Sequence, residues 1–256
     1  RQTTASDFRT ITRAALSDAP ALKKVTENGE FEHGAVTDGK ETYQLATYGK
    51  IVGFTRQSMI NDDLGALTRI PAAMAMAAAN LESDTVYGVL TTNAALSDSV
   101  ALFHATHGNL TGTGTDISVA SLGVARALMR KQKSPQSAVM NIRPRFLIVP
   151  AAKETIAAQF VSQAYVASQS SVVNPFAGSL DVVAEARLDD NSATAWYLAA
   201  DPSVIDTIEY CYLEGQQGAY IETRQGFEVD GMEIKVRLDF AAKAIDYRGL
   251  YKNNGA

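Results

Sequence analysis

Three histidines, His33, His104 and His107, are the side chains of this sequence best suited to acid–base or metal chemistry. The pair in His104-Ala-Thr-His107 could supply half of a metal site, but a structural zinc ion takes about four ligands. A glycine follows the pair directly, and the surrounding residues are typical of a loop rather than of a helix that presents both rings. We therefore expect no metal and no other cofactor.

Other patterns that could do chemistry are also incomplete. A serine hydrolase could use one of the histidines, but the sequence has no G-x-S-x-G nucleophile motif. Residues Gly34–Lys40 have the spacing of a phosphate-binding loop, yet Glu41 stands where a Ser or Thr should bind magnesium. The adjacent Asp62 and Asp63, with Asn61 before them, are better explained as the start of a helix. We expect no enzymatic activity, with a histidine-dependent hydrolase as the alternative.

The composition sets further bounds on function. The 256 residues are 46% hydrophobic and 20% charged, which is typical of a soluble globular protein. The 23 basic and 28 acidic side chains give a net charge of −5, which argues against a general nucleic-acid binder. The single cysteine, Cys211, lies in an apolar run and is expected to be a buried thiol. No segment resembles a signal peptide or a membrane span, so we expect no membrane partner and an origin in the cytoplasm.

One long helix dominates the elements that must position these residues. It is predicted over Ile70–Asn93, where alanine is abundant and Pro71 suits the first helical turn. Apolar residues recur at the spacing of one buried helical face. That face comprises Met74, Ala77, Ala78, Leu81, Thr85, Val86, Val89 and Leu90.

An arm and a hairpin precede this helix. In residues 1–28, Phe8, Ile11, Ala14 and Ala15 suggest one or two amphipathic helical turns. Residues 31–57 predict a long hairpin whose turn is Thr37–Lys40, because Asp-Gly suits a tight turn, and whose second strand continues through Tyr48–Phe54. Two strands cannot bury a core alone. The hairpin must therefore lie on its own body or on another subunit.

The remainder of the chain mixes helices and strands. Two further helices are predicted, from the Ser118 cap to about Gln132 and over Lys153–Gln163, with a loop at 166–178. A turn is predicted at Glu214–Gly218. Strands are predicted over residues 145–149, 180–187, 195–199, 204–213, 219–224, 227–230 and 232–239.

Seven stretches are the most distinctive parts of the sequence: Tyr48–Gln57, Asn61–Gly65, Leu102–Asn109, Arg145–Pro150, Trp196–Ala200, Glu209–Gly215 and Asp246–Lys252. In this order and at this spacing they resemble the major capsid proteins of tailed bacteriophages. The similarity is greatest to the subgroup that is encoded as a fusion with a Clp-like prohead protease, and it covers nearly the whole chain.

The resemblance implies an α+β chain with the Hong Kong 97-type capsid fold. Residues 1–28 would be the N-terminal arm and 29–57 the E-loop hairpin, which lies across a neighbouring subunit. Residues 58–99 would form the peripheral domain with its long spine helix, 100–203 the axial domain, and 204–256 the peripheral β-ribbon and return strand. Lys40 and Lys50 would lie in the E-loop, but no asparagine or glutamate matches a covalent cross-link by motif.

The implied function is that of a structural head protein, which self-assembles as hexamers and pentamers into an icosahedral shell around double-stranded phage DNA. Maturation would cleave the chain before Arg1. The portal, a scaffold and the protease would be partners in the host cytoplasm, and the virion capsid the final location. DNA contact is expected from the basic arm, and the alternative is an encapsulin-like shell. Expected inter-subunit contacts are Phe8, Arg9, Arg13, Phe31, Lys40, Tyr43, Tyr48, Lys50, Gln216 and Gln217.

Overall fold

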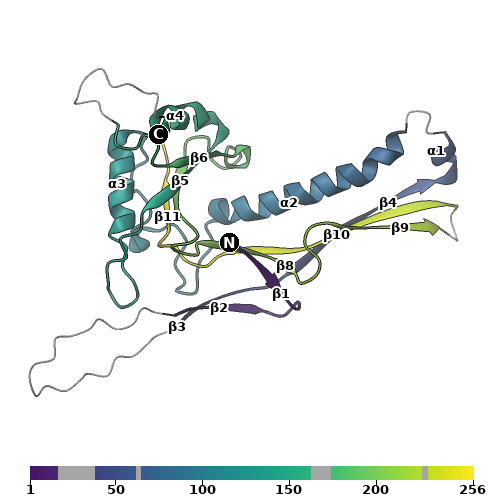
Figure 1. Cartoon of the computed structure of the whole chain (residues 1–256), viewed down its shortest axis with the longest axis horizontal. Helices are drawn as coiled ribbons and strands as arrows, with labels where there is room; N and C mark the ends of the chain where they lie inside the picture. The colour runs from purple at the N-terminus through teal and green to yellow at the C-terminus, as the bar shows by residue number, and fades with distance from the viewer. Residues whose placement is uncertain (17–37, 62–64, 163–173, 227–229) are drawn as a thin grey trace, which may run out of the picture.

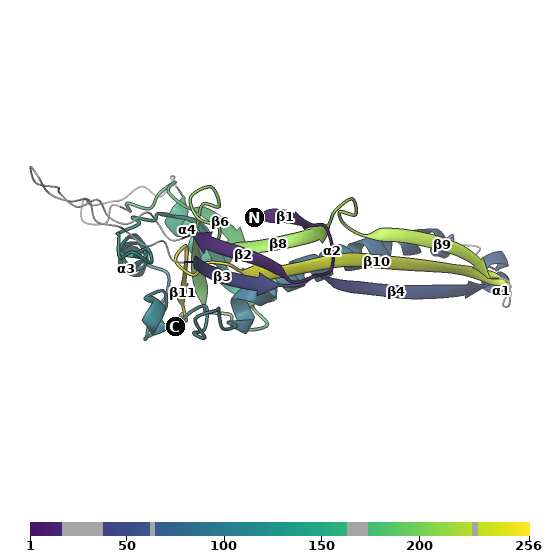
Figure 2. The same ribbon diagram turned by 90° about the horizontal axis from the view of Figure 1, so that it is seen from below.

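The computed structural model describes residues 1–16, 38–61, 65–162, 174–226 and 230–256, and the chain it describes is elongated (Figure 1). A compact half at one end contains a four-stranded sheet with helices around it. A long helix and a long sheet extend from this half to the opposite end of the molecule (Figures 1 and 2).

The long half is organised around β10 (Gly231–Ala244). On one edge β10 pairs antiparallel with β4 (Ala46–Thr55) over ten consecutive residues. On the other edge it pairs first with β9 (Tyr220–Gly226) and then with β8 (Ile208–Leu213), both antiparallel. The short β1 (Gln2–Ala5) adds parallel to β8, which completes a five-stranded sheet (Figure 2).

The predicted long helix is confirmed as α2 (Ile70–Thr92), with proline in its first turn and Asn93 ending it at a φ of 50°. A short 3-10 helix, η1 (Ala66–Arg69), precedes it. The helix lies along one face of the five-stranded sheet (Figure 1). Of its predicted buried face, Met74, Ala78 and Leu90 are buried in the single chain, whereas Ala77 is exposed.

The opposite face of the sheet carries a two-stranded ribbon, β2 (Ile11–Leu16) and β3 (Asp38–Tyr43). A small core of Ala5, Tyr43, Leu45 and Cys211 joins the root of this ribbon to the sheet. The helical turns predicted from Phe8 to Ala15 are wrong, because residues 11–16 pair with β3 along their whole length. The β-branched Ile11 and Thr12 favour a strand at this position.

The hairpin turn predicted at Thr37–Lys40 is also wrong. Gly39 and Lys40 lie within β3 and pair with Ala15 and Ala14 of β2. The Asp-Gly signal is local, and pairing between distant segments overrides it here. The connection between the two strands, residues 17–37, lies outside the described residues, and so does the Gly34–Lys40 pattern for the most part.

Two further expectations around residue 50 need correction. The stretch Tyr48–Phe54 does not extend the hairpin, because β4 belongs to the body and pairs with β10. Asn61 is not the N-cap of a following helix but the C-cap of α1 (Arg56–Ile60), which Thr55 caps at its start. Asp62 and Asp63 lie outside the described residues.

The compact half contains a second sheet, whose strands lie in the order β11 (Leu250–Asn253), β7 (Trp196–Ala200), β5 (Pro144–Val149) and β6 (Asp181–Ala184). The helix predicted at Ser118 is confirmed as α3 (Val119–Arg130), where Ser118 and Ser121 form a reciprocal capping box. Trp196 lies at 0% exposure in the core between the sheet and the helices. The remaining elements are α4 (Glu154–Val161) and the short 3-10 helices η2 (Ala105–His107), η3 (Ala151–Lys153) and η5 (Ala186–Leu188).

The strand predicted for 227–230 cannot be assessed, because 227–229 lie outside the described residues. The same holds for most of the loop predicted at 166–178. The turn predicted at Glu214–Gly218 is confirmed, with Gly215 and Gly218 at φ values of 77° and 81° that glycine adopts without strain.

Candidate assembly surfaces

The two neighbouring histidines are used for structure. His104 Nδ1 accepts a hydrogen bond from the Thr106 N–H at 3.2 Å and so caps η2. His107 is buried, with its Nε2 2.8 Å from an Asp98 carboxylate oxygen and its Nδ1 3.2 Å from the Leu102 carbonyl oxygen. Its ring stacks on Tyr247 at 3.7 Å between centroids. Within the described part of the chain, no three potential ligands come together as a metal site.

The contact between His107 and Asp98 also sets the charge of the carboxyl group. Partial burial opposes ionisation, but the hydrogen bonds from His107 and from the Val100 N–H lower the pKa of Asp98 below its ordinary value. The stacking of His107 on Tyr247 joins the 94–110 segment to the turn that leads from β10 to β11.

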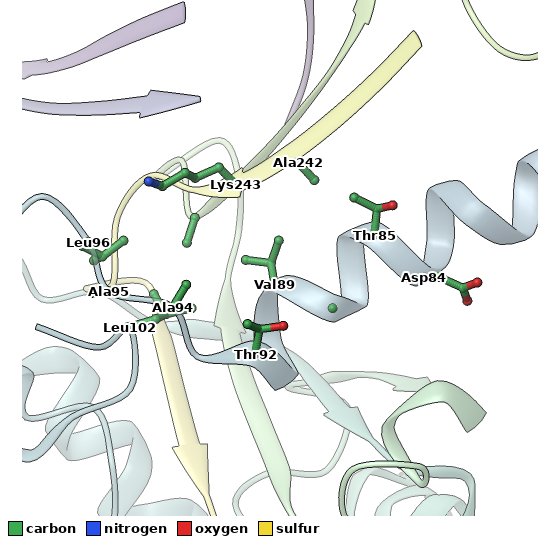
Figure 3. Close-up of a pocket in the computed structure, with 12 residues that line it drawn as sticks. Asp84, Thr85, Val89, Thr92, Ala94, Ala95, Leu96, Leu102, Ala242 and Lys243 are labelled. Carbon is green, nitrogen blue, oxygen red and sulfur yellow. The ribbon is translucent and has the colours of Figure 1, made fainter. Parts of the chain in front are cut away.

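Two hollows of the surface have mostly apolar linings. One of about 340 Å³ lies between the end of α2, residues 94–96 and the end of β10 (Figure 3). Val89 and Thr92 face it from α2, and Asp84 and Lys243 are the charged side chains in its lining. Another, of about 490 Å³, separates α2 from β4. Apolar linings of this kind suit the burial of another surface better than acid–base chemistry.

The ribbon is anchored to the sheet by a buried carboxylate on β8. The Arg13 Nε and the Tyr43 hydroxyl both donate to the same oxygen of Glu209, and the Arg13 side chain also donates to Thr3 Oγ1 at 2.8 Å. Burial and the bond to Glu209 raise the pKa of Tyr43 far above its ordinary value, so this hydroxyl remains a donor. Burial likewise raises the pKa of Cys211, whose thiol is buried as predicted.

A second buried carboxylate, Glu41 of β3, holds the ribbon from the other side. It accepts a hydrogen bond from the Ser97 N–H at 2.6 Å and lies 3.4 Å from Lys243 Nζ of β10. Sequence reasoning missed the role of Glu41 and Glu209. The signal for Glu209 was a single acid in the otherwise apolar run Ile208–Leu213, since a charge there must find a partner.

The residues predicted to contact neighbouring subunits differ in their surroundings. Arg13 and Tyr43 bond within their own chain, and Gln216 accepts a hydrogen bond from Arg237 at 2.8 Å. Phe31 lies outside the described residues. The side chains that extend into solvent are Phe8, Arg9, Lys40, Lys50 and Gln217, with Tyr48 half-buried beside the groove between α2 and β4.

Large apolar side chains are exposed far from the ribbon as well. Ile60 and Met76 near the outer end of α2 are 66% and 71% exposed, and Ile51 on β4 is 58% exposed. Val139 and Val204, in loops of the compact half, are 65% and 67% exposed. Single apolar side chains scattered over a surface are normal, so these residues do not by themselves mark an interface.

A long helix laid on a long sheet, a compact α+β half and an anchored two-stranded ribbon together define the Hong Kong 97-type fold of phage capsid proteins. Solved capsid structures from other sources share it. A Microbacterium phage Oxtober96 protein is 11% identical with a TM-score of 0.63, covering 99% of this chain and 88% of that one. The cyanophage P-SCSP1u capsid protein is 8% identical with a TM-score of 0.64, covering 100% and 86%. The capsid protein of a native GTA particle is 10% identical with a TM-score of 0.65, covering 100% and 87%.

The sequence itself places the chain in a family. Residues 39–253 match the family described as phage capsid protein, and the chain belongs to that family. Membership identifies it as a structural component of a bacteriophage capsid and points away from an enzymatic role. No curated protein matches it significantly. None of the helices that the structure describes has the length and apolar character to cross a membrane.

Proposed function

We propose that this chain is the major head subunit, which self-assembles as hexamers and pentamers into an icosahedral shell around double-stranded phage DNA. The main observation behind this proposal concerns the β2–β3 ribbon. Buried carboxylates hold the ribbon at its root, and Lys40 of the ribbon is exposed to solvent. A pair of strands with so little core of its own is stable only on another surface. Family membership and the capsid fold support the same role.

The subunit divides by function into the parts that the resemblance implied. Residues 1–28 act as the N-terminal arm and 29–57 as the E-loop, except for β4, which belongs to the five-stranded sheet. Residues 58–99 act as the peripheral domain with α2 as its spine, 100–203 as the axial domain and 204–256 as the peripheral ribbon and return strand. The pairing of β2 with β3 supports an E-loop that also includes residues 11–16.

The inter-subunit contacts proposed are Phe8, Arg9, Arg13, Phe31, Lys40, Tyr43, Tyr48, Lys50, Gln216 and Gln217. Arg13 and Tyr43 would act by holding the ribbon in position, since their side chains bond to Glu209 of the same chain. The exposed Phe8 and Lys50 would contact sister subunits directly. Obligate interfaces of this type typically bury about 2,000 Å² or more.

Electron microscopy of the purified protein tests the assembly. We expect closed, regular particles that elute near the void volume in size-exclusion chromatography. A protein that stays monomeric at high concentration under all conditions that favour assembly would contradict the proposal. The nucleic-acid content of particles from infected cells separates a phage head from an encapsulin-like shell, which would contain cargo protein instead.

The proposal extends to maturation. In the implied subgroup the chain is made as a fusion with a Clp-like protease, assembles with portal and scaffold in the host cytoplasm, and loses an upstream segment by cleavage to give the virion capsid. Mass spectrometry is expected to show that subunits from mature virions are shorter than subunits from immature particles. Equal masses would remove the cleavage from the proposal and leave the assembly untouched.

A further inference from the structure

Positive charge is concentrated in one segment of this acidic chain. Residues 117–153 contain seven Lys and Arg side chains and no Asp or Glu, whereas the rest of the sequence carries 28 acidic against 16 basic residues. The segment forms α3, the turn after it and β5. A separation of charge this marked gives one part of the surface a positive potential that the net charge of −5 conceals.

Two of the seven cations are neutralised within the chain. Arg145 lies 3.1 Å from Asp181 and 2.6 Å from Asp201, and Lys153 Nζ lies 2.6 Å from Asp116. Among the residues that the structure describes, the other five form no ion pair with a carboxylate. We call these five the basic surface: Arg126, Arg130, Lys131, Lys133 and Arg143.

Packing explains only part of the basic surface. The Arg126 guanidinium lies 4.4 Å from the centroid of the Phe176 ring, and Arg130 leaves its Nε buried without a hydrogen-bond partner. Lys131, Lys133 and Arg143 are exposed. The negative end of a helix dipole favours cations in the last turn, which accounts for Arg130 and Lys131 but not for Lys133 or Arg143.

The N-terminal arm, which the sequence made the expected DNA-binding segment, is different. Each of its described arginines already has a carboxylate partner: Arg1 pairs with Asp206, Arg9 with Asp7 at 3.6 Å and Arg13 with Glu209. These ion pairs would have to break before the arginines could bind phosphate groups. Their loss would offset part of the binding free energy that the new contacts supply. The basic surface has no such pairs to break within the described part of the chain.

We propose that the basic surface binds the phosphate backbone of the enclosed double-stranded DNA. This inference rests on the proposed function, because it assumes that the chain surrounds a genome. DNA presents about one negative charge per 1.7 Å of its axis and needs no fixed register with the protein. Exposed lysines on a helix end and a turn bind such a continuous array as flexible point charges, without reading base sequence.

The test compares two full-length triple variants with the wild type, all as unassembled subunits. Lys131→Gln/Lys133→Gln/Arg143→Gln removes the exposed part of the basic surface. Arg56→Gln/Arg69→Gln/Arg224→Gln removes the same formal charge at the opposite end of the molecule, where all three side chains are exposed. Arg56 and Arg224 each pair with a carboxylate, Asp230 and Glu233 respectively. The probe is a DNA duplex of about 30 base pairs in fluorescence anisotropy, titrated from about 50 to 200 mM salt. Particle formation is scored separately by electron microscopy.

For the basic-surface variant we expect binding at about 0.1 M salt to weaken at least tenfold and the salt slope to fall by roughly 0.9 for each phosphate that the protein no longer neutralises. The control variant should keep nearly all of the wild-type affinity.

Equal reductions of affinity in both variants would overturn the inference while leaving the shell function intact. Failure of the basic-surface variant alone to assemble, with DNA affinity unchanged, would also overturn it and assign the surface to an interface with a sister subunit. Failure of the wild type to form particles would count against the proposed function instead.

Discussion

At the residue scale, Glu209 and Glu41 are the carboxylates whose surroundings have the clearest consequence. Each is less than 10% exposed, and each joins β2 or β3 to a strand or loop far away in the sequence. Leaving a buried cation or hydroxyl without its acceptor is costly. These two side chains therefore fix where the ribbon leaves the body.

The first prediction concerns Glu209→Gln. Loss of the charge weakens the bonds from Arg13 and Tyr43, and hydrogen bonds to charged groups are worth about 1.5–3 kcal/mol. Because Arg13 is 34% exposed and keeps access to water, we expect a loss near the lower end of that range in urea unfolding of the unassembled subunit. Glu222→Gln, at the exposed pair with Lys235, is the control and should cost less than about 0.5 kcal/mol. Equal losses would show that Glu209 does not anchor the ribbon.

The second prediction concerns acid stability. Hydrogen bonds from the Ser203 side chain and N–H, together with Arg145, lower the pKa of Asp201 to about 2. A carboxyl group with a lowered folded-state pKa adds stability above its unfolded pKa of about 3.9 and loses it as the pH falls through the folded value. Wild type and Asp201→Asn should therefore differ most in melting temperature above about pH 4 and converge towards about pH 2. A difference that stays constant over this whole range of pH would contradict the ionisation argument.

At the element scale, local rules determine the helices. Alanine content and Pro71 were enough to predict α2, and the Ser118 cap was enough to predict the start of α3. Both signals act within one or two turns of the chain, so no knowledge of the fold was required. Because these signals are local, they could not predict the pairing of β2, β3 and β4, which was wrongly predicted from the sequence. β2 and β3 are separated by residues 17–37, and β4 pairs with a strand about 180 residues later.

A third prediction tests the cap of α3. Ser118→Ala removes the acceptor for the Ser121 N–H and should destabilise the subunit by about 1 kcal/mol. Ser118→Asp keeps an acceptor at the same place and should restore most of that loss. Thermal unfolding of the two variants measures the difference. Equal melting temperatures for the alanine and aspartate variants would show that the cap contributes nothing.

The candidate site was less predictable than the elements. The sequence marked Phe8, Lys40 and Lys50 as contact residues only through a family resemblance, because a contact with another chain leaves no periodic pattern in its own sequence. The ribbon anchors Glu41 and Glu209 depend on partners 56 and 196 residues away. Such pairs become visible only when the fold brings the segments together.

At the scale of the whole molecule, removal of the proposed E-loop is the most direct test of assembly. Deleting Glu30–Gln57 would be unsuitable, because β4, Tyr43 and Leu45 belong to the body and its core. The structure suggests a cleaner change. Leu16 lies directly opposite Asp38, so a two-residue Asn-Gly turn can replace residues 17–37 and close the ribbon.

The fourth prediction is that this shortened chain folds with an unchanged circular-dichroism spectrum and a melting temperature close to that of the wild type, yet forms no stable shell. Electron microscopy and size-exclusion chromatography measure assembly. A control chain in which residues 17–37 are replaced by a Gly/Ser linker of equal length separates loss of reach from loss of specific recognition. Complete shells from the shortened chain would remove residues 17–37 from the assembly interface.

The length of β10 has a mechanical consequence. This one strand of 14 residues holds β4, β9 and β8 in register, and a short turn connects its end to β11 in the compact half. Tension applied between the two ends of the subunit is therefore carried by covalent backbone, with rows of hydrogen bonds loaded in shear on both sides. The helix α2 runs alongside β10 and resists bending, so the subunit is stiffest against a load applied along its long axis (Figure 1).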